Sequence, residues 1–125
     1  MDSKTTGKLG EDYASQRLIQ DGWKIIARNY RSPYGEIDII AEKADTIAFI
    51  EVKTRASNYM YRPAQAVTPL KQLKILNTAE YYLSQHDDYM KCQMQLDVIE
   101  IVVQLKNGFK VTEYNHIQQA FTDTR

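Results

Sequence analysis

The spacing of hydrophobic residues predicts a helix at the start of the chain. Between about Ser3 and Gln20 the apolar residues recur three or four positions apart, as they do on one side of an amphipathic helix. Ser3 or Thr5 is expected to cap the first turn of this helix, and Gly22 is expected to end it. The side chains that form the apolar stripe are Leu9, Tyr13, Ala14, Leu18 and Ile19.

The next part of the chain has the composition of strands and predicts a three-stranded meander. Aromatic and β-branched residues from Trp23 to Tyr30 are followed by a turn signal at residues 32–35, which contains Pro and Gly. Two further apolar runs come next, with a polar turn at residues 42–45 between them. These runs extend from Glu36 to Ala41 and from Thr46 to Thr54.

A second helix is predicted after a polar, Tyr-rich loop. It begins with Thr68 as its cap and Pro69 in its first turn, and it ends before an acidic turn at Asp87 and Asp88. Residues at helical spacing predict the side of this helix that faces the core. That side contains Leu70, Leu73, Leu76 or Asn77, Ala79 or Glu80, and Leu83.

Strand signals return in the last part of the chain. Residues 96–103 are apolar on both faces, as expected of a strand in the interior of a sheet. Gly108 leads into a short strand, Phe109 to Tyr114, and residues 115–125 are expected to add a helical turn. The order of helix, three strands, helix and one or two strands predicts a single α/β domain over residues 1–125, with a mixed sheet flanked by helices.

Composition excludes several classes of protein. The single cysteine, Cys92, cannot form an intramolecular disulfide and provides no cluster for zinc, so we expect a cytoplasmic protein. No apolar run approaches the roughly 18 to 20 residues that span a bilayer, so we expect no membrane partner. His86 and His116 show no ligand spacing and are expected at the surface. Because 16 basic and 16 acidic residues cancel, affinity for nucleic acid must come from a local patch.

Charged side chains in two of the predicted strands carry the candidate chemistry. Burying the charges of Asp38, Glu51 and Lys53 within apolar strands is unfavourable unless a partner compensates them. Glu51 and Lys53 project from the same face because side chains alternate along a strand. Asp38 and Glu51 are almost equidistant from the turn at residues 42–45, which places them at a similar height on adjacent strands. Mg²⁺ or Mn²⁺, which favour oxygen ligands, would relieve their repulsion.

These residues fit the catalytic roles of a metal-dependent nuclease. Lys53 is placed to orient an attacking water or to stabilise the charge of the transition state. A further metal-binding acid can come from the first helix, where Glu11 borders the apolar face. Each residue also has a simpler interpretation: Glu11 as a solvated helix acid, Asp38 as a turn residue, and Glu51 with Lys53 as a salt bridge on a solvated face.

A local group of basic residues is the candidate nucleic-acid surface. No acidic residue occurs between Glu51 and Glu80, whereas five basic residues do, and two tyrosines lie among them. Such a segment can contact phosphates and stack on exposed bases, and the alternative is a set of ordinary solvated side chains. The residues predicted to contact nucleic acid are Arg28, Arg31, Arg55, Arg62, Lys71 and Lys74.

Three motifs together resemble those of a known family. They are Gly-Xaa-Xaa-Gly-Glu-Xaa-Xaa-Ala at residues 7–14, Arg-Asn-Tyr-Arg at 28–31 with Gly-Glu-Ile-Asp at 35–38, and Phe-Ile-Glu-Val-Lys-Thr-Arg at 49–55. The combination resembles the YraN-type family of uncharacterised bacterial proteins, over most of the chain. That family is similar to the archaeal Holliday-junction resolvases and belongs with the restriction-endonuclease-like PD-(D/E)XK fold.

The resemblance implies an α-β-β-β-α-β core. It assigns Glu11, Asp38 and Glu51 as metal-binding acids and Lys53 as the catalytic lysine, with Lys71 where related nucleases often carry a supporting polar or basic residue. The chain departs from the family pattern in two places. Gln65 stands where the family commonly has an acid, and residues 95–98 read Gln-Leu-Asp-Val in place of Arg-Phe-Asp-Val.

The function expected from these observations is that of a Mg²⁺- or Mn²⁺-dependent DNA endonuclease that hydrolyses phosphodiester bonds. Branched DNA, including Holliday junctions, is the candidate substrate, and a homodimer is a secondary expectation because paired sites allow paired incisions. Two alternatives stay open. One is a nucleic-acid-binding or adaptor module that keeps the fold without useful catalysis, and the other is a structural protein.

Overall fold

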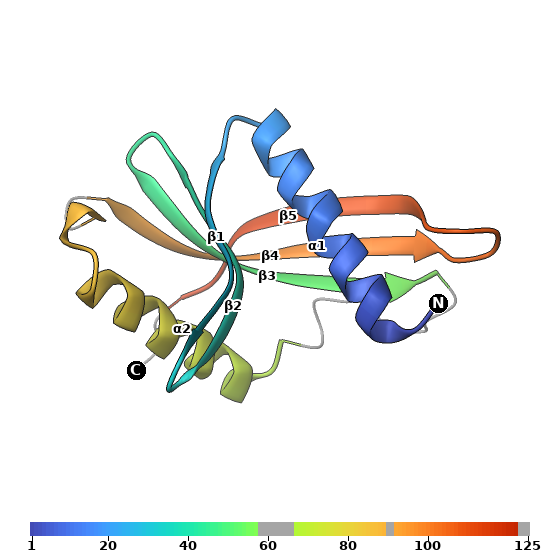
Figure 1. Cartoon of the computed structure of the whole chain (residues 1–125). Coiled ribbons are helices and arrows are strands. Elements are labelled where there is room, and N and C mark those ends of the chain that lie inside the picture. Colours follow the sequence, from blue (N-terminus) through green and yellow to red (C-terminus); the bar gives the residue numbers. More distant parts are fainter. Residues whose placement is uncertain (58–66, 90–91, 123–125) are drawn as a thin grey trace.

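The computed structural model describes residues 1–57, 67–89 and 92–122 (Figure 1). It contains one five-stranded sheet in the order β1-β2-β3-β4-β5. β3 and β4 run parallel, and the other neighbouring pairs are antiparallel, so the sheet is mixed as expected. The elements are α1 (Ser3–Gln20), β1 (Lys24–Ser32), β2 (Gly35–Lys43), β3 (Thr46–Ala56), α2 (Pro69–Ser84), the 3₁₀ helix η2 (Asp87–Tyr89), β4 (Gln93–Gln104) and β5 (Lys110–Phe121).

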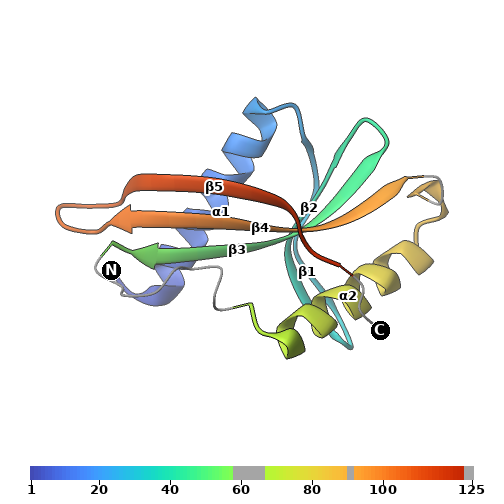
Figure 2. The ribbon, with the colours of Figure 1, turned by 180° about the vertical axis from the view of Figure 1, so that it is seen from behind.

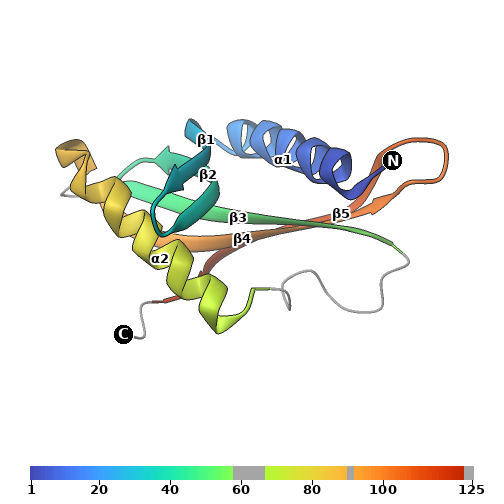
Figure 3. The same cartoon turned by 60° about the horizontal axis from the view of Figure 1, so that its bottom comes forward.

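The two long helices cover opposite faces of the sheet (Figure 3). α2 lies in the connection between the parallel strands β3 and β4, as such pairs require. The predicted α/β class is therefore confirmed. No helix of the described part of the chain is long and apolar enough to cross a membrane. The α1 side buries Ala14, Leu18, Trp23, Ile39, Ala41, Ala48, Ile50, Val52, Ile99, Ile101 and Val103, and the α2 side buries Ile37, Ile40, Ile47, Phe49, Ile75, Leu76, Ala79, Tyr82 and Leu96.

α1 has the predicted length but a different cap. Asp2, and not Ser3 or Thr5, is the N-cap, because its carboxylate accepts a hydrogen bond from the Thr5 backbone N–H at 2.7 Å. The helix ends as predicted at Gly22, whose φ of +95° is a left-handed conformation that favours glycine.

α2 begins as predicted, with Thr68 as its cap and Pro69 in its first turn, but only part of its predicted core side is buried. Leu76 and Ala79 are buried as predicted, and Leu83 packs against the core. Leu70 and Leu73, which were expected in the core, are 63% and 40% exposed. The side that is buried carries polar and aromatic residues that contact the β1–β2 hairpin, which hydropathy alone does not predict. Its buried residues are Ile75, Leu76, Thr78, Ala79 and Tyr82. Thr78 Oγ1 hydrogen-bonds Ser32 Oγ at 3.1 Å, and Tyr82 packs edge-on against Tyr30 and Phe49.

The expected helical turn after residue 115 is wrong, because β5 continues to Phe121. Asp97 on the neighbouring strand β4 is fully buried and holds this part of β5 through its two carboxylate oxygens. One oxygen lies 2.7 Å from His116 Nε2, and the other accepts a hydrogen bond from the Gln119 backbone N–H at 2.9 Å. His116 is therefore not a surface residue, and its side chain is only 10% exposed.

The β1–β2 hairpin turns away from the long strands β3, β4 and β5 (Figures 1 and 2). Strands β2 and β3 pair from Lys43 and Thr46 as far as Ile39 and Ile50. β3 continues beyond that point and pairs only with β4, as far as Ala56. The sheet is thus open between the residues of β2 that precede Ile39 and the residues of β3 that follow Ile50, and the candidate site lies at this opening.

α1 crosses β3 in close contact at a glycine. A Cβ atom at Gly10 would overlap Thr54 Oγ1 and would lie 3.0 Å from Thr54 Cβ, so only glycine allows this approach. Thr54 Oγ1 is buried and has no hydrogen-bond partner among the described residues. The neighbouring residue on α1 is Glu11, so this contact also determines how near Glu11 lies to the sheet.

We expect Gly10→Ala to lower the free energy of unfolding by about 1 kcal/mol. Overpacking of roughly 1 to 3 kcal/mol should outweigh the gain of up to about 1 kcal/mol in helix propensity. Urea unfolding of Gly10→Ala, Thr54→Ala and the double variant measures the effect, and the double variant should recover much of the loss. Gly7→Ala is the control, because a Cβ at Gly7 meets no atom within 4 Å and should stabilise the helix. If the changes in the free energy of unfolding caused by Gly10→Ala and Thr54→Ala add in the double variant, a methyl group at position 10 does not strain the contact with Thr54.

Candidate functional site

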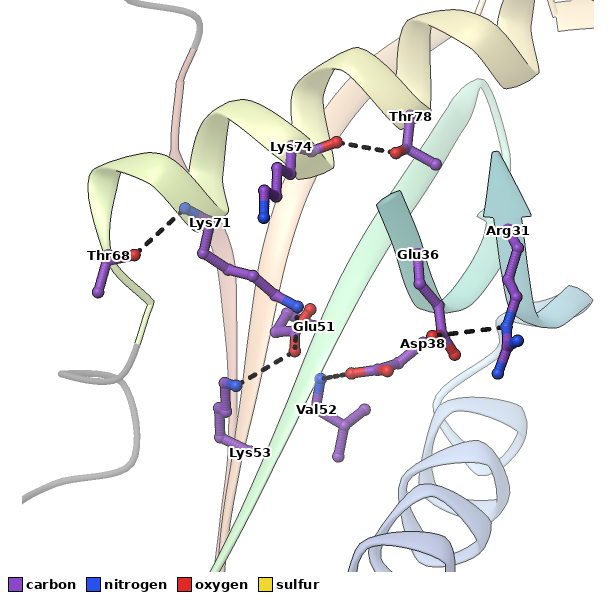
Figure 4. A network of polar contacts seen from close by, with 10 residues as sticks. All are labelled: Arg31, Glu36, Asp38, Glu51, Val52, Lys53, Thr68, Lys71, Lys74 and Thr78. Carbon is purple, nitrogen blue, oxygen red and sulfur yellow. Dashed lines mark hydrogen bonds and ion pairs between the residues drawn. The ribbon is translucent and has the colours of Figure 1, made fainter. Parts of the chain in front are cut away.

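Asp38 lies on β2 at the position where β2 leaves β3. The pairing of β2 with β3 covers Ile39 to Lys43, so Asp38 is the residue just before the paired part of β2. Beyond the last backbone pair of the two strands, the Asp38 side chain continues the contact between them. Its Oδ2 accepts a hydrogen bond from the Val52 backbone N–H at 2.7 Å (Figure 4). A backbone donor that would lose its partner is satisfied in this way, and the carboxylate is held against β3.

Glu51 is a buried carboxylate that contacts two lysines. Its Oε1 lies 3.3 Å from Lys53 Nζ, two residues further along β3, and 3.8 Å from Lys71 Nζ on α2 (Figure 4). The Glu51 side chain is 6% exposed and the Lys53 side chain 18%. The predicted projection of Glu51 and Lys53 from one face is confirmed by this contact. Lys71 reaches the site because it lies on the side of α2 that faces the sheet.

Burial and the nearby Glu51 change the protonation of Asp38. Burial and the negative charge of Glu51 raise the pKa of Asp38 to about 7, against the smaller opposing effect of the Val52 hydrogen bond. The pair therefore retains a proton near neutral pH. Such a shift is typical of functional carboxylates, although structural pairs also produce it.

Glu11 approaches the same place from α1. It lines a hollow of about 530 Å³ together with Asp38, Glu51 and Lys53. Burial and the nearby Asp38 raise the pKa of Glu11, whereas the Arg28 guanidinium, at 3.7 Å, opposes that rise. The full lining is Met1, Ser3, Thr6, Gly7, Glu11, Asp38, Glu51, Val52, Lys53, Thr54, Arg55, Ala56 and Leu105.

The acids offer a partial set of ligands for a cation. Asp38 and Glu51 supply hard oxygen atoms of the kind that Mg²⁺ and Mn²⁺ favour, and Glu11 lies in the same hollow. Within residues 1–57, 67–89 and 92–122, however, no three acidic, histidine or cysteine side chains converge as a metal-ligand group. Glu51 is compensated by ammonium groups instead.

The predicted nucleic-acid residues differ in their surroundings. Arg28 contacts Asp12 at 2.8 Å, and Arg31 contacts Glu36 at 3.6 Å, so both have carboxylate partners. Arg55 lines the site hollow and donates to the Thr54 carbonyl, and neither it nor the exposed Lys74 makes an ion pair among the described residues. Lys71 lies beside Glu51. Arg62 falls outside the described residues.

Two residues near the site were not predicted from the sequence. Asp12 binds Arg28 and so competes for a cation that was expected to meet phosphate. Asn29 has a φ of +53°, and its side chain lies close enough to Glu11 to lower the pKa of that carboxyl. The sequence offers one signal, since asparagine is enriched in left-handed backbone, but the signal does not reveal the contact with α1.

We expect Asp38→Asn to raise the free energy of unfolding of the metal-free protein above that of wild type, and to do so more at pH 8 than at pH 5. A carboxyl whose folded pKa exceeds its unfolded value contributes stability that is complete below about pH 4 and is lost as the pH rises through 7. Asparagine keeps an oxygen for the Val52 N–H and cannot ionise, so the gain over wild type should grow with pH, up to about 4 kcal/mol. Urea unfolding in a chelator at both pH values measures it. An equal effect at pH 5 and pH 8 would contradict the raised pKa.

Comparison with known proteins places the chain in a family. Residues 10–101 match the model of the uncharacterised protein family UPF0102. A UPF0102 protein of Caldicellulosiruptor bescii is 42% identical over 97% of this chain and 100% of its own length. One from Chlorobium phaeobacteroides is 44% identical over 96% of this chain and 95% of its own length. Another, from Clostridium perfringens, is 39% identical over 95% of both chains. The chain therefore belongs to the UPF0102 family, which is the YraN-type family that its motifs resemble.

Proposed function

We propose that the protein is a metal-dependent endonuclease that hydrolyses phosphodiester bonds in DNA, with branched DNA as the preferred substrate. The observation that carries the proposal is the pair of Asp38 and Glu51 with Lys53 beside them, at an opening in the sheet. The pair is buried enough to raise the pKa of Asp38, yet it lines a hollow that a substrate can enter. A purely structural ion pair does not need such an opening.

The donor set suits Mg²⁺ or Mn²⁺. Asp38 and Glu51 would hold the cation, with Glu11 as a third acid from α1. The raised pKa of Asp38 supports this assignment, because a cation would offset both causes of the rise, the burial of the carboxylate and its repulsion by Glu51. When bound, the divalent cation supplies activation of a water molecule and neutralisation of charge on the phosphate.

The cationic side chains have separate roles in this proposal. The Lys53 ammonium, held on β3 beside Glu51, stabilises the negative charge that develops on the phosphate during attack. Lys71 approaches from α2 on the other side of Glu51 and orients the substrate phosphate. Arg55, on the wall of the same hollow, binds a neighbouring phosphate.

A nucleic-acid-binding or adaptor module without catalysis is the second candidate function. Two observations favour it. Glu51 already has two ammonium partners, and the described residues contain no convergent group of three metal ligands. In such a module Lys53 and Lys71 would satisfy Glu51 permanently. The test below separates the two candidates, because only the first requires metal-dependent cleavage.

We expect the wild-type protein to cleave at least one member of a panel of linear duplex, single-stranded, flap and four-way-junction DNA in Mn²⁺ or Mg²⁺. Asp38→Asn should reduce the rate by at least about 100-fold, because it removes a ligand charge without removing the hydrogen bond to Val52. Lys53→Ala should reduce kcat more than it changes KM. Gel-based cleavage assays at a series of metal concentrations give both quantities.

The matched control is Asp45→Asn, which removes the same charge at an exposed turn between β2 and β3. It should cleave like the wild type. Absence of cleavage in every metal and substrate, together with intact junction binding and no Mn²⁺ binding by calorimetry, would reject the nuclease and favour the binding module. Cleavage that persists in Asp38→Asn would point to a contaminating enzyme.

We also propose that the protein acts as a homodimer. Leu70 and Leu73 on α2 are large apolar side chains exposed to solvent, and a contact between copies would cover them. Light scattering should give about twice the chain mass of 14.5 kDa, and Leu70→Gln with Leu73→Gln should give the monomer. The control is Ile19→Gln on α1, where an isoleucine is 59% exposed on the other side of the sheet. A wild-type monomer at micromolar concentration would argue against paired incision.

A further inference from the structure

Gly7 is a glycine within α1 whose presence packing does not explain. Glycine in a helix interior is about 1 kcal/mol less favourable than alanine. The contact with Thr54 accounts for Gly10, but a Cβ atom built on Gly7 meets no atom within 4 Å. The missing side chain at Gly7 therefore leaves open space above the helix and serves no contact within the described part of the chain.

That open space lies where two hollows meet. The first is the site hollow, which holds Asp38, Glu51 and Lys53. The second has a volume of about 570 Å³ and lies on the other side of the start of α1. Ser3, Gly7 and Glu11 line both hollows, so a side chain at Gly7 would stand between them. The remaining residues of the second hollow are Lys4, Lys8, Arg28, Asn29 and Glu36.

Each hollow contains a cation that no carboxylate neutralises among the described residues. In the second hollow this cation is Lys4, whereas Lys8 and Arg28 contact Asp12 at 3.3 and 2.8 Å. In the site hollow it is Arg55, whose guanidinium donates to the Thr54 carbonyl and makes no ion pair with residues 1–57, 67–89 or 92–122. Unpaired cations on both sides of a bare helix surface suit a ligand with negative charges repeated along its length, such as a nucleic-acid backbone.

We propose that a nucleic-acid strand crosses α1 at Gly7, with one phosphate beside Arg55 and a later phosphate beside Lys4. The absence of a side chain lets the strand lie against the helix backbone between the two hollows. Lys4 and Gly7 thus form a subsite that holds the strand beyond the position of cleavage. The identity of the ligand rests on the proposed function, but the subsite is tested by binding alone.

Three substitutions of Gly7 separate shape from stability. Gly7→Ala, Gly7→Gln and Gly7→Glu should all unfold at or above the wild-type temperature, because each replaces a helix-interior glycine by a better helix former in open space. In fluorescence anisotropy with labelled single-stranded and four-way-junction DNA, in a chelator, Gly7→Ala should bind within about twofold of wild type. Gly7→Gln should bind about tenfold more weakly through obstruction, and Gly7→Glu more weakly still through repulsion.

Two further variants complete the experiment. Gln16→Glu adds the same charge as Gly7→Glu about 180° around α1, and it should leave binding unchanged. Lys4→Ala should weaken binding and reduce the slope of log K against log salt by about 0.7 to 0.9, which corresponds to one lost phosphate contact. Gly7→Gln binding as tightly as Gly7→Ala, or a wild type that binds no nucleic acid, would overturn the subsite.

The outcome is independent of the cleavage test. If the wild type cleaves DNA and Gly7→Gln binds DNA as tightly as wild type, the subsite is rejected and the proposed function stands. If binding depends on Gly7 and Lys4 but the wild type cleaves no DNA, the subsite stands and the nuclease is rejected. The same set of purified variants therefore decides both questions separately.

Discussion

The contact between Glu51 and its two lysines is the interaction on which the arrangement of the site depends. A carboxylate that is 6% exposed on a central strand is costly to bury, and Lys53 and Lys71 compensate it from the strand and from α2. Asp38 can lie beside Glu51 because the backbone of β3 donates a hydrogen bond to it where β2 turns away. The opening of the sheet and the concentration of charge thus coincide, because both carboxylates lie directly beyond the last pair of β2 and β3, Ile39 and Ile50.

The second constraint is the close approach of α1 to β3. Glu11 and the strand acids come from different elements, and only the distance of the helix from the sheet brings them to one hollow. Gly10 sets that distance through its contact with Thr54. The two helix glycines therefore act differently, since Gly10 allows contact within the protein and Gly7 leaves space above it. Helix propensity alone would count both as defects, whereas packing distinguishes them.

The fold and the central acids could be predicted because local rules determine them. Side-chain alternation and a short turn place the acids of β2 and β3 together, and a cap with a following proline fixes the start of α2. The errors arise where distant contacts decide. On α2 the core side includes the predicted Leu76 and Ala79 but is displaced from Leu70 and Leu73. Thr78 also belongs to that side and hydrogen-bonds Ser32 of the β1–β2 hairpin, a contact that leucine content does not reveal. β5 continues because buried Asp97 holds His116, although the local sequence of β5 favours no such strand. The nuclease chemistry itself stays a prediction.

The competition for Glu51 separates the proposed nuclease from the binding module in physical terms. A divalent cation that approaches Glu51 would meet two ammonium groups at the same carboxylate. The side chain of Lys71 is 37% exposed and that of Lys53 18%. Because Lys71 is closer to solvent, its ammonium group can move away from Glu51 more easily than that of Lys53. A phosphate at the mouth of the hollow would draw Lys71 away from Glu51, so metal and substrate would bind more tightly together than apart. The free energy needed to move Lys71 from Glu51 then decides the function. If phosphate and cation together supply it, the site is a nuclease, and if they do not, the same residues bind DNA without cleaving it.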